Sequence, residues 1–210
     1  MSLSTFHQRV SRAIKRGNVF DADIPGYARD AVRSLEDYNN WKHMWVEEEV
    51  ALGVGASSRT IDGLKMCRFV KRKTTDGLYL PLKKVIPDEL LQIGTAVGAT
   101  PGAFWMESRE KINFDAIPTT VQTLRYGYYL YSDYDDFLPW LNISENLLIG
   151  QTILEMSPIL KDDKITGRYA PIVQAKIAVL EESEADLDYD GMDSRQIPYA
   201  DEMEEYLAGG

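Results

Sequence analysis

The chain has 210 residues, of which 44% are hydrophobic and 27% are charged, a composition typical of a globular protein. Because it contains no run of about 18 apolar residues and no apolar segment near its start, we expect neither a membrane span nor a signal peptide. A single cysteine, Cys67, excludes an internal disulfide framework and an all-cysteine zinc site. Since only His7 and His43 supply imidazoles, we expect a cytosolic protein that is not an enzyme and uses no cofactor.

The net charge of −10 belongs to the end of the chain. Residues 181–210 contain eleven acids and a single base, Arg195, whereas residues 1–180 contain 22 acids and 22 bases. An acidic segment repels the phosphates of nucleic acids. General binding of DNA by this part of the chain is therefore disfavoured.

Two helices are predicted at the start of the chain. The first has an apolar stripe at helical spacing over residues 3–14, with basic side chains off the stripe. The same pattern fits a mitochondrial presequence, but a second predicted helix follows it closely. That helix begins at Asp23 and Pro25, because proline is well tolerated in a first turn, and it ends before Trp41. Its polar face is predicted to hold Arg29, Asp30, Arg33, Glu36 and Asp37.

From Trp45 onward the apolar period changes to two residues, which predicts strands. Asp76 and Gly77 form a hairpin signal, because an Asp-Gly pair readily adopts positive φ. We expect five or six strands, a short helix opened by Pro87, and a loop of small residues over 94–102. The expected strands cover residues 45–52, 66–73, 78–82, 104–107, 111–114 and 121–131.

Helical spacing returns after Asp133. Asn142 is predicted to cap a helix in a capping box with Glu145, and Pro158 is predicted to kink that helix near its end. A last helix is expected over residues 165–184, with Pro171 near its start. The predicted class is therefore α+β: a helical bundle formed by residues 1–42 and 133–184, an inserted β-rich domain over 43–132, and an extended acidic C-terminal arm over 185–210.

Four carboxylates form the most metal-like group in the sequence. Hard cations prefer several carboxylate ligands, so a metal-dependent hydrolase is one alternative reading. The group lacks the glycine and the distal glutamate of a calcium loop, which favours a solvated loop instead. Its members are Asp133, Asp135, Asp136 and Asp162.

Three further features favour structural roles. The basic residues 71–73 and 83–84 could bind phosphates, which leaves a nucleic-acid-binding module as another alternative, but a soluble edge of a sheet is the simpler reading. Cys67 lies in an apolar strand without a neighbouring histidine, which predicts a buried and unreactive thiol. The tyrosine-rich run 126–131 predicts core and interface aromatic side chains rather than a stacking platform.

The acidic arm combines its charges with large apolar side chains. A solvated tail has no need of such side chains, whereas a segment that orders on a partner uses them as anchors within an acidic rim. We therefore predict that the arm is an interaction segment. The predicted partner-contacting residues are Tyr189, Met192, Ile197, Tyr199, Met203, Tyr206 and Leu207.

Over residues 4–185 the order of segments resembles the head–tail adaptor (head-completion or connector) proteins of tailed bacteriophages, in particular the type of short-tailed phages. Two departures are visible. A Leu-Pro segment usual in that family is replaced by residues 63–69, and the acidic arm is longer than the common pattern. The matching pieces are Ile24-Pro25 with Ala31–Glu36 and Trp41, then Tyr79–Leu90, Pro101–Met106, Leu124–Tyr126 and Asn146–Asp163.

The resemblance implies a structural virion protein rather than an enzyme. Such a protein forms a homo-oligomeric, usually dodecameric, ring under the portal protein, extends the DNA channel, and provides the attachment site for tail or nozzle proteins. Genomic DNA would pass through the lumen without sequence-specific binding, and no membrane would be involved. The expected location is the head–tail connector of the virion, after synthesis in the host cytoplasm.

Overall fold

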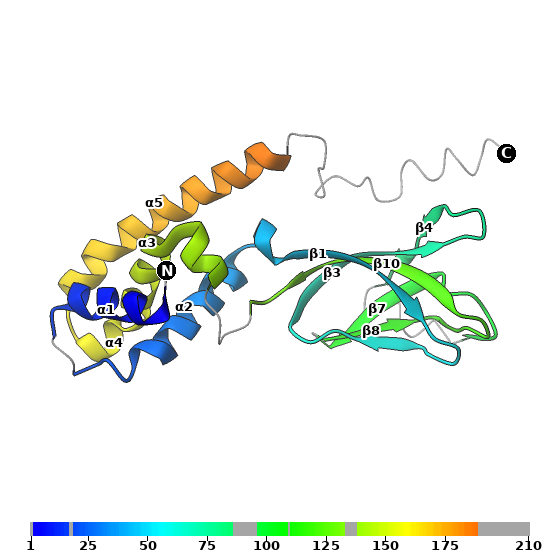
Figure 1. The fold of residues 1–210 in the computed structure, drawn as a ribbon, viewed down its shortest axis with the longest axis horizontal. Helices are drawn as coiled ribbons and strands as arrows, with labels where there is room; N and C mark the ends of the chain where they lie inside the picture. The colour runs from blue at the N-terminus through cyan, green and yellow to red at the C-terminus, as the bar shows by residue number, and fades with distance from the viewer. Residues whose placement is uncertain (1, 17–18, 86–95, 109, 133–137, 189–210) are drawn as a thin grey trace.

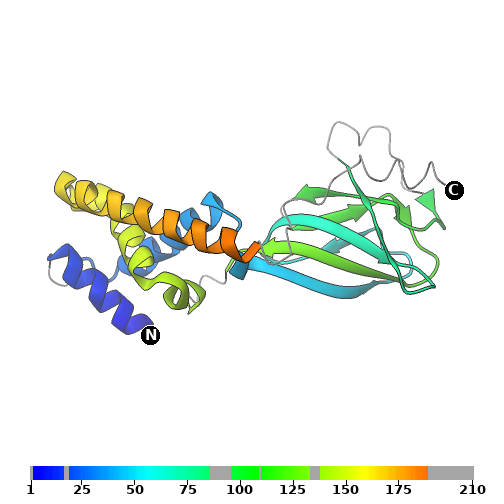
Figure 2. The same cartoon turned by 90° about the horizontal axis from the view of Figure 1, so that it is seen from above.

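A computed structural model describes residues 2–16, 19–85, 96–108, 110–132 and 138–188 (Figure 1). Helices and sheets both occur, which confirms the predicted α+β class. The helices gather at one end of the molecule and the strands at the other, in both views (Figures 1 and 2). We refer to these as the helical part, α1–α5, and the strand part, β1–β10.

The helical part contains elements from both ends of the described chain. A 3-10 turn, Lys42–Met44, leads from it into the first strand. The predictions of the first two helices are confirmed, since each begins and ends within a residue or two of its signals. The helices are α1 (Leu3–Ile14), α2 (Ile24–Tyr38), α3 (Leu138–Glu155), α4 (Ser157–Leu160) and α5 (Asp163–Asp188).

The strand part consists of two four-stranded sheets and one pair. The strand orders are β1-β10-β3-β4, β2-β8-β7-β5 and β6-β9. In the first sheet the antiparallel partners β1 and β10 pair from Trp45–Tyr129 to Leu52–Gln122. The strands are β1 (Trp45–Leu52), β2 (Ser58–Thr60), β3 (Leu64–Lys73), β4 (Tyr79–Pro81), β5 (Lys83–Lys84), β6 (Ala96–Val97), β7 (Ala103–Ser108), β8 (Lys111–Phe114), β9 (Ala116–Ile117) and β10 (Gln122–Leu130).

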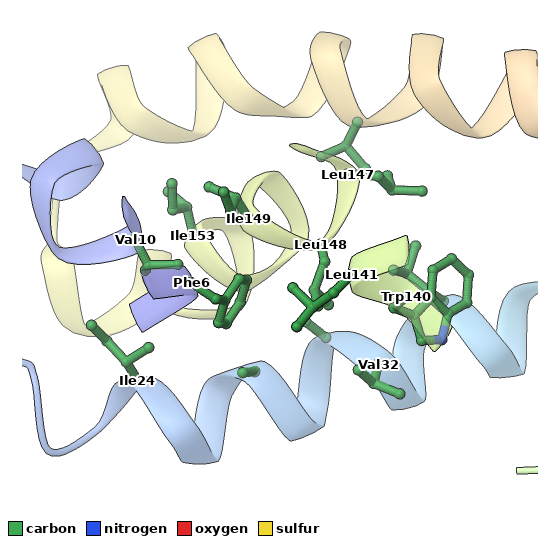
Figure 3. Close-up of a cluster of buried hydrophobic side chains, with 14 of the residues drawn as sticks. Phe6, Val10, Ile24, Val32, Trp140, Leu141, Leu147, Leu148, Ile149 and Ile153 are labelled. Atoms are coloured by element: carbon green, nitrogen blue, oxygen red, sulfur yellow. The ribbon is translucent and has the colours of Figure 1, made fainter. Parts of the chain in front are cut away.

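The core of the helical part surrounds α3. Side chains of α1 and α2 converge on α3 from one side, as the close-up shows (Figure 3), while α5 packs on it as well. Each fully buried side chain of this size contributes about 1.5–3 kcal/mol to folding. The residues that meet here include Phe6 and Val10 of α1, Ile24 and Val32 of α2, and Trp140, Leu147, Leu148 and Ile153 of α3.

A second core fills the strand part. It is built from alternate side chains of β10, from Leu64, Cys67 and Val70 of β3, which are three residues apart, and from the middle strands of the other four-stranded sheet. The pairing of β3 with β10 has register shifts, so the buried positions of β3 do not alternate. Along β10 they do. This alternation is the period of two seen in the sequence, because successive residues of a strand point to opposite faces. Its fully buried members include Cys67, Val70, Phe104, Ile112, Phe114, Leu124 and Tyr126.

Some sequence predictions of local structure were wrong. The short strands β2, β5, β6 and β9 were not predicted, because two or three residues are too few to show a period. The helix expected to be capped by Asn142 begins at Leu138, and Ser144 has non-helical φ and ψ of −157° and 84° inside it. Pro171 lies well inside α5, because that helix begins at Asp163. The short helix expected at residues 87–92 lies outside the described residues.

The basic run over residues 71–73 does not lie at a free sheet edge, as the soluble-edge reading supposed. Its strand, β3, is flanked by β10 on one side and by β4 on the other, with Lys71 opposite Pro81 and Lys73 opposite Tyr79. The Lys73 ammonium pairs with Glu49 at 3.2 Å across the sheet. This run is thus part of a charged outer face of the sheet.

The prediction that Glu36 lies on the polar face of α2 was also wrong. Its side chain is fully buried, 0% exposed. Glu36 follows Val32 by one helical turn and therefore lies at the border of the apolar stripe. Chain segments about a hundred residues away cover that border, so local spacing could not decide the side on which Glu36 falls.

Candidate functional site

The predicted interaction residues of the arm, Tyr189 to Leu207, lie outside the described residues. Helix α5 continues to Asp188, so the first residues assigned to the arm, from Ala185, extend that helix. Residues 185–188, the first of the predicted arm, therefore belong to α5.

The metal-site alternative falls mostly outside the described residues. Asp133, Asp135 and Asp136 lie outside the described residues, whereas Asp162 is described and lies near the start of α5. Asp162 approaches the Arg16 guanidinium at 3.7 Å and accepts a hydrogen bond of 3.1 Å from the backbone N–H of Lys164. Among the residues that the structure describes, no group of three His, Cys, Asp or Glu side chains could hold a metal ion.

Burial keeps the thiol of Cys67 and the phenols of Tyr126 and Tyr128 in their neutral, unreactive forms. Cys67 is completely buried, as predicted, and burial raises its pKa to about 12. Burial likewise raises the pKa of Tyr126 to about 12, although the nearby Arg59 opposes this shift. The Tyr128 hydroxyl donates a hydrogen bond of 2.5 Å to Glu48, and burial together with this bond raises its pKa. These tyrosines act as core side chains with one polar contact each.

A buried carboxylate joins the helices to the strand that returns from the sheets. Glu36 Oε1 accepts a hydrogen bond of 3.0 Å from Trp140 Nε1 of α3. Its Oε2 accepts a hydrogen bond of 3.1 Å from the backbone N–H of Ser132, which follows β10. One side chain of α2 thus fixes both the end of the strand part and the start of α3.

Polar contacts at the surface reinforce this junction. The Tyr131 hydroxyl donates a hydrogen bond of 2.7 Å to Asp37, and the Arg33 guanidinium lies 3.4 Å from the centre of the Tyr131 ring. From β3, the Lys65 ammonium donates to the backbone carbonyls of Glu36 and of Asn39, at 2.7 Å for the latter. Burial lowers the pKa of Lys65, while Asp37 and Glu36 raise it. These contacts hold the two parts in one orientation.

The strand part presents apolar side chains at the end that faces away from the helices. The sheet register places the loops after β1 and β3 and the segment before β10 at this end. Isolated apolar side chains on a surface need no explanation, but several at one end suit contact with another protein. The exposed side chains are Val54, Leu78 and Val121, which are 62%, 66% and 61% exposed.

A basic hollow of about 330 Å³ lies between the C-terminal end of α1 and the start of α5. Four of its lining residues are cationic, and apolar side chains of Ile14, Ile165 and Tyr169 form its other walls. Asp162 is the acid on its rim. Sequence analysis did not find this hollow, because its two basic pairs are about 150 residues apart. The cationic residues are Lys15, Arg16, Lys164 and Arg168.

Comparison with models of known protein families and with curated proteins gives no match. Along the part of the chain that the structure describes, no helix has both the length and the apolar character needed to cross a membrane.

Proposed function

We propose that this chain is a head–tail adaptor of a tailed bacteriophage. Its subunits would form a ring, dodecameric by resemblance, that docks under the portal protein, continues the DNA channel and receives tail or nozzle proteins. In this proposal residues 1–42 and 133–184 form the helical bundle of the subunit, and residues 43–132 form the inserted β-rich domain. The protein is a structural component of the virion connector and not an enzyme.

The observation that carries the proposal is the two-part subunit with contact surfaces on both parts. The strand part exposes Val54, Leu78 and Val121 at its far end, and α5 exposes Ile172 and Val179 to 43% and 63%. A closed ring needs two different faces that meet, and an adaptor needs further faces above and below. A chain that keeps such surfaces apart and fixes them through the Glu36 junction suits this role.

The electrostatics of the proposal concern the channel. DNA moves easily only past a surface that does not grip its phosphates, since each neutralised phosphate releases counterions and adds affinity. We therefore expect the lumen of the assembled ring to be acidic or neutral. A continuous ring of lysine and arginine side chains along the lumen would contradict this expectation.

The test is the mass of the purified full chain, alone and mixed with a candidate portal protein. We expect the wild-type chain to form a closed ring on the portal. The double variant Leu78→Asp/Val121→Asp should lose the binding of partner proteins at the far end of the strand part. Val19→Asp is the matched control, because Val19 is 75% exposed but lies between α1 and α2. A chain that stays monomeric at all concentrations and does not bind the portal protein would overturn the proposal.

A further inference from the structure

We propose that the basic hollow between α1 and α5 is the acceptor site for the acidic C-terminal arm of a second copy of this chain. This inference rests on the proposed ring, since it assigns a subunit contact within it. The occupant is residues 201–207, which carry four carboxylates together with Met203, Tyr206 and Leu207.

Charge complementarity is the first argument. Lys15, Arg16, Lys164 and Arg168 line the hollow, while Asp162 is its acid among the described side chains. Asp162 offsets one of the four positive charges, and its ion pair with Arg16 is long, at 3.7 Å, with both side chains partly exposed. The hollow therefore keeps an excess of positive charge that an acidic segment would satisfy.

The walls of the hollow favour an acidic peptide over a nucleic acid. Ile14, Ile165 and Tyr169 give it an apolar side, and its volume is near the lower end of the range of about 300–1,000 Å³ for pockets that hold small ligands. A phosphate backbone offers charges but no aliphatic groups. The sequence Glu205-Tyr206-Leu207 offers a carboxylate followed by two apolar side chains.

The reach of the arm favours a neighbouring copy over the same chain. Helix α5 carries the chain away from the hollow, and Lys164 and Asp188 are separated by about 36 Å along it at 1.5 Å per residue. The segment from residue 189 to 201 spans at most about 43 Å when fully extended. The mean end-to-end distance of a random coil of this length is about 20 Å. Return to its own hollow would require nearly full extension, which disfavours that route and leaves the hollow of a second copy as the acceptor.

In a closed ring the number of arms equals the number of hollows. Each identical subunit offers one arm and one hollow, so the contact joins two different faces and repeats around a closed ring. Salt would weaken the contact, because part of its free energy is electrostatic attraction between exposed charges.

The experiment uses the full chain with a photo-cross-linking p-benzoylphenylalanine in place of Tyr206. Chains with nitrogen-14 and nitrogen-15 are mixed before irradiation, and the cross-linked peptides are sequenced by mass spectrometry. We expect cross-links that join the two isotopes and map to residues 161–169 or 12–16. In the double variant Lys164→Glu/Arg168→Glu their yield should fall by about tenfold, because like charges then face one another. Arg72→Glu/Lys176→Glu changes two cations that do not line the hollow, so it is the matched control and should leave the yield unchanged.

Three outcomes would overturn the inference. They are cross-links only within chains of one isotope, cross-links outside residues 161–169 and 12–16, and an unchanged cross-link yield in Lys164→Glu/Arg168→Glu. Binding of a short DNA duplex that is lost in Lys164→Glu/Arg168→Glu would assign the hollow to nucleic acid instead. A ring that docks on the portal without this cross-link would overturn the inference and leave the adaptor function intact. If the copies cross-link in this way but have no affinity for a portal, the contact between arm and hollow is supported and the adaptor function is overturned.

Discussion

The indole Nε1 of Trp140 donates its hydrogen bond of 3.0 Å to the fully buried carboxylate of Glu36. Trp140 is itself 0% exposed, and its ring meets that of Trp41 edge-on with centroids 5.7 Å apart. A carboxyl oxygen so deep in the protein is tolerated because N–H donors from α3 and from Ser132 satisfy it. This pair therefore couples the packing of the helices to the exit of the chain from the sheets.

Replacing Glu36 tests that coupling. In Glu36→Leu the N–H groups of Trp140 and Ser132 lose their acceptor, and each buried unsatisfied donor costs about 1–3 kcal/mol. We expect the free energy of unfolding to fall by about 2–5 kcal/mol, measured by urea denaturation. Glu182→Leu, at an exposed position of α5, is the control and should change it little. Equal stability of the two variants would show that the carboxylate is dispensable.

Gly127 tests the packing where β10 passes β1 and β3. A methyl group at this position would lie 2.4 Å from Phe69 Cε1 and 2.6 Å from Trp45 Cη2. We expect Gly127→Ala to lower stability by about 1–3 kcal/mol through overpacking, seen as a lower midpoint of thermal unfolding. The matched change Gly53→Ala meets nothing within 4 Å and should be neutral. A neutral Gly127→Ala would mean that both aromatic rings move aside without loss.

His43 predicts how stability depends on pH. Its ring packs edge-on against Trp140 with centroids 4.9 Å apart, and burial lowers its pKa from 6.5 to about 4. The unfolded chain therefore binds a proton at His43 in a pH range in which the folded chain does not. This contribution to stability is complete above pH 6.5 and is lost progressively as the pH falls towards 4.

The measurement is the free energy of unfolding of the wild type and of His43→Phe between pH 7 and pH 5. We expect the wild type to lose more stability than the variant over this range, because the phenylalanine does not titrate. His7→Asn is the necessary second variant, since burial also lowers the pKa of His7 while Asp21 raises it. Parallel curves for wild type and His43→Phe would contradict the prediction.

We expect the affinity of assembly onto the portal to depend on burial of the apolar side chains of the arm. Tyr199 and Tyr206 would each contribute about 1.5–3 kcal/mol on full burial, against about 1–2 kcal/mol for each residue ordered, so several anchors must be buried together. We expect truncation after Asp188 to weaken assembly onto the portal by more than tenfold, and Tyr199→Ala or Tyr206→Ala to weaken it by about tenfold each. Ser194→Ala is the control within the arm. Unchanged affinity and stoichiometry in all three variants would leave the arm without a role.

The sequence was sufficient where a segment shows its own periodicity. The stripe of Phe6, Val10 and Ile14 defined α1, and all three side chains are buried. The alternation along β10 defined a strand whose Tyr126 and Tyr128 point into the core. In these segments the information is local, because it depends on residues two to four positions apart.

The junction could not be predicted in this way. Glu36 is a partner of Trp140 and Ser132, which are 104 and 96 residues away, and a single sequence contains no signal of that pairing. The one local hint is that Glu36 lies one turn after the buried Val32. The basic hollow has the same origin, since it exists only because α1 and the start of α5 meet.

The pairing of β1 with β10 has a consequence for the order of folding. Helices α2 and α3 are separated by about 100 residues along the chain, but once Trp45 lies opposite Tyr129 the remaining gap is fewer than about 20 residues, which reduces the entropic cost of bringing the helices together by about 1.5 kcal/mol. We therefore expect the rate-limiting barrier to lie in forming this long-range strand pair. Substitutions in β1 and β10 should slow refolding, whereas substitutions in α1, which docks afterwards, should mainly accelerate unfolding.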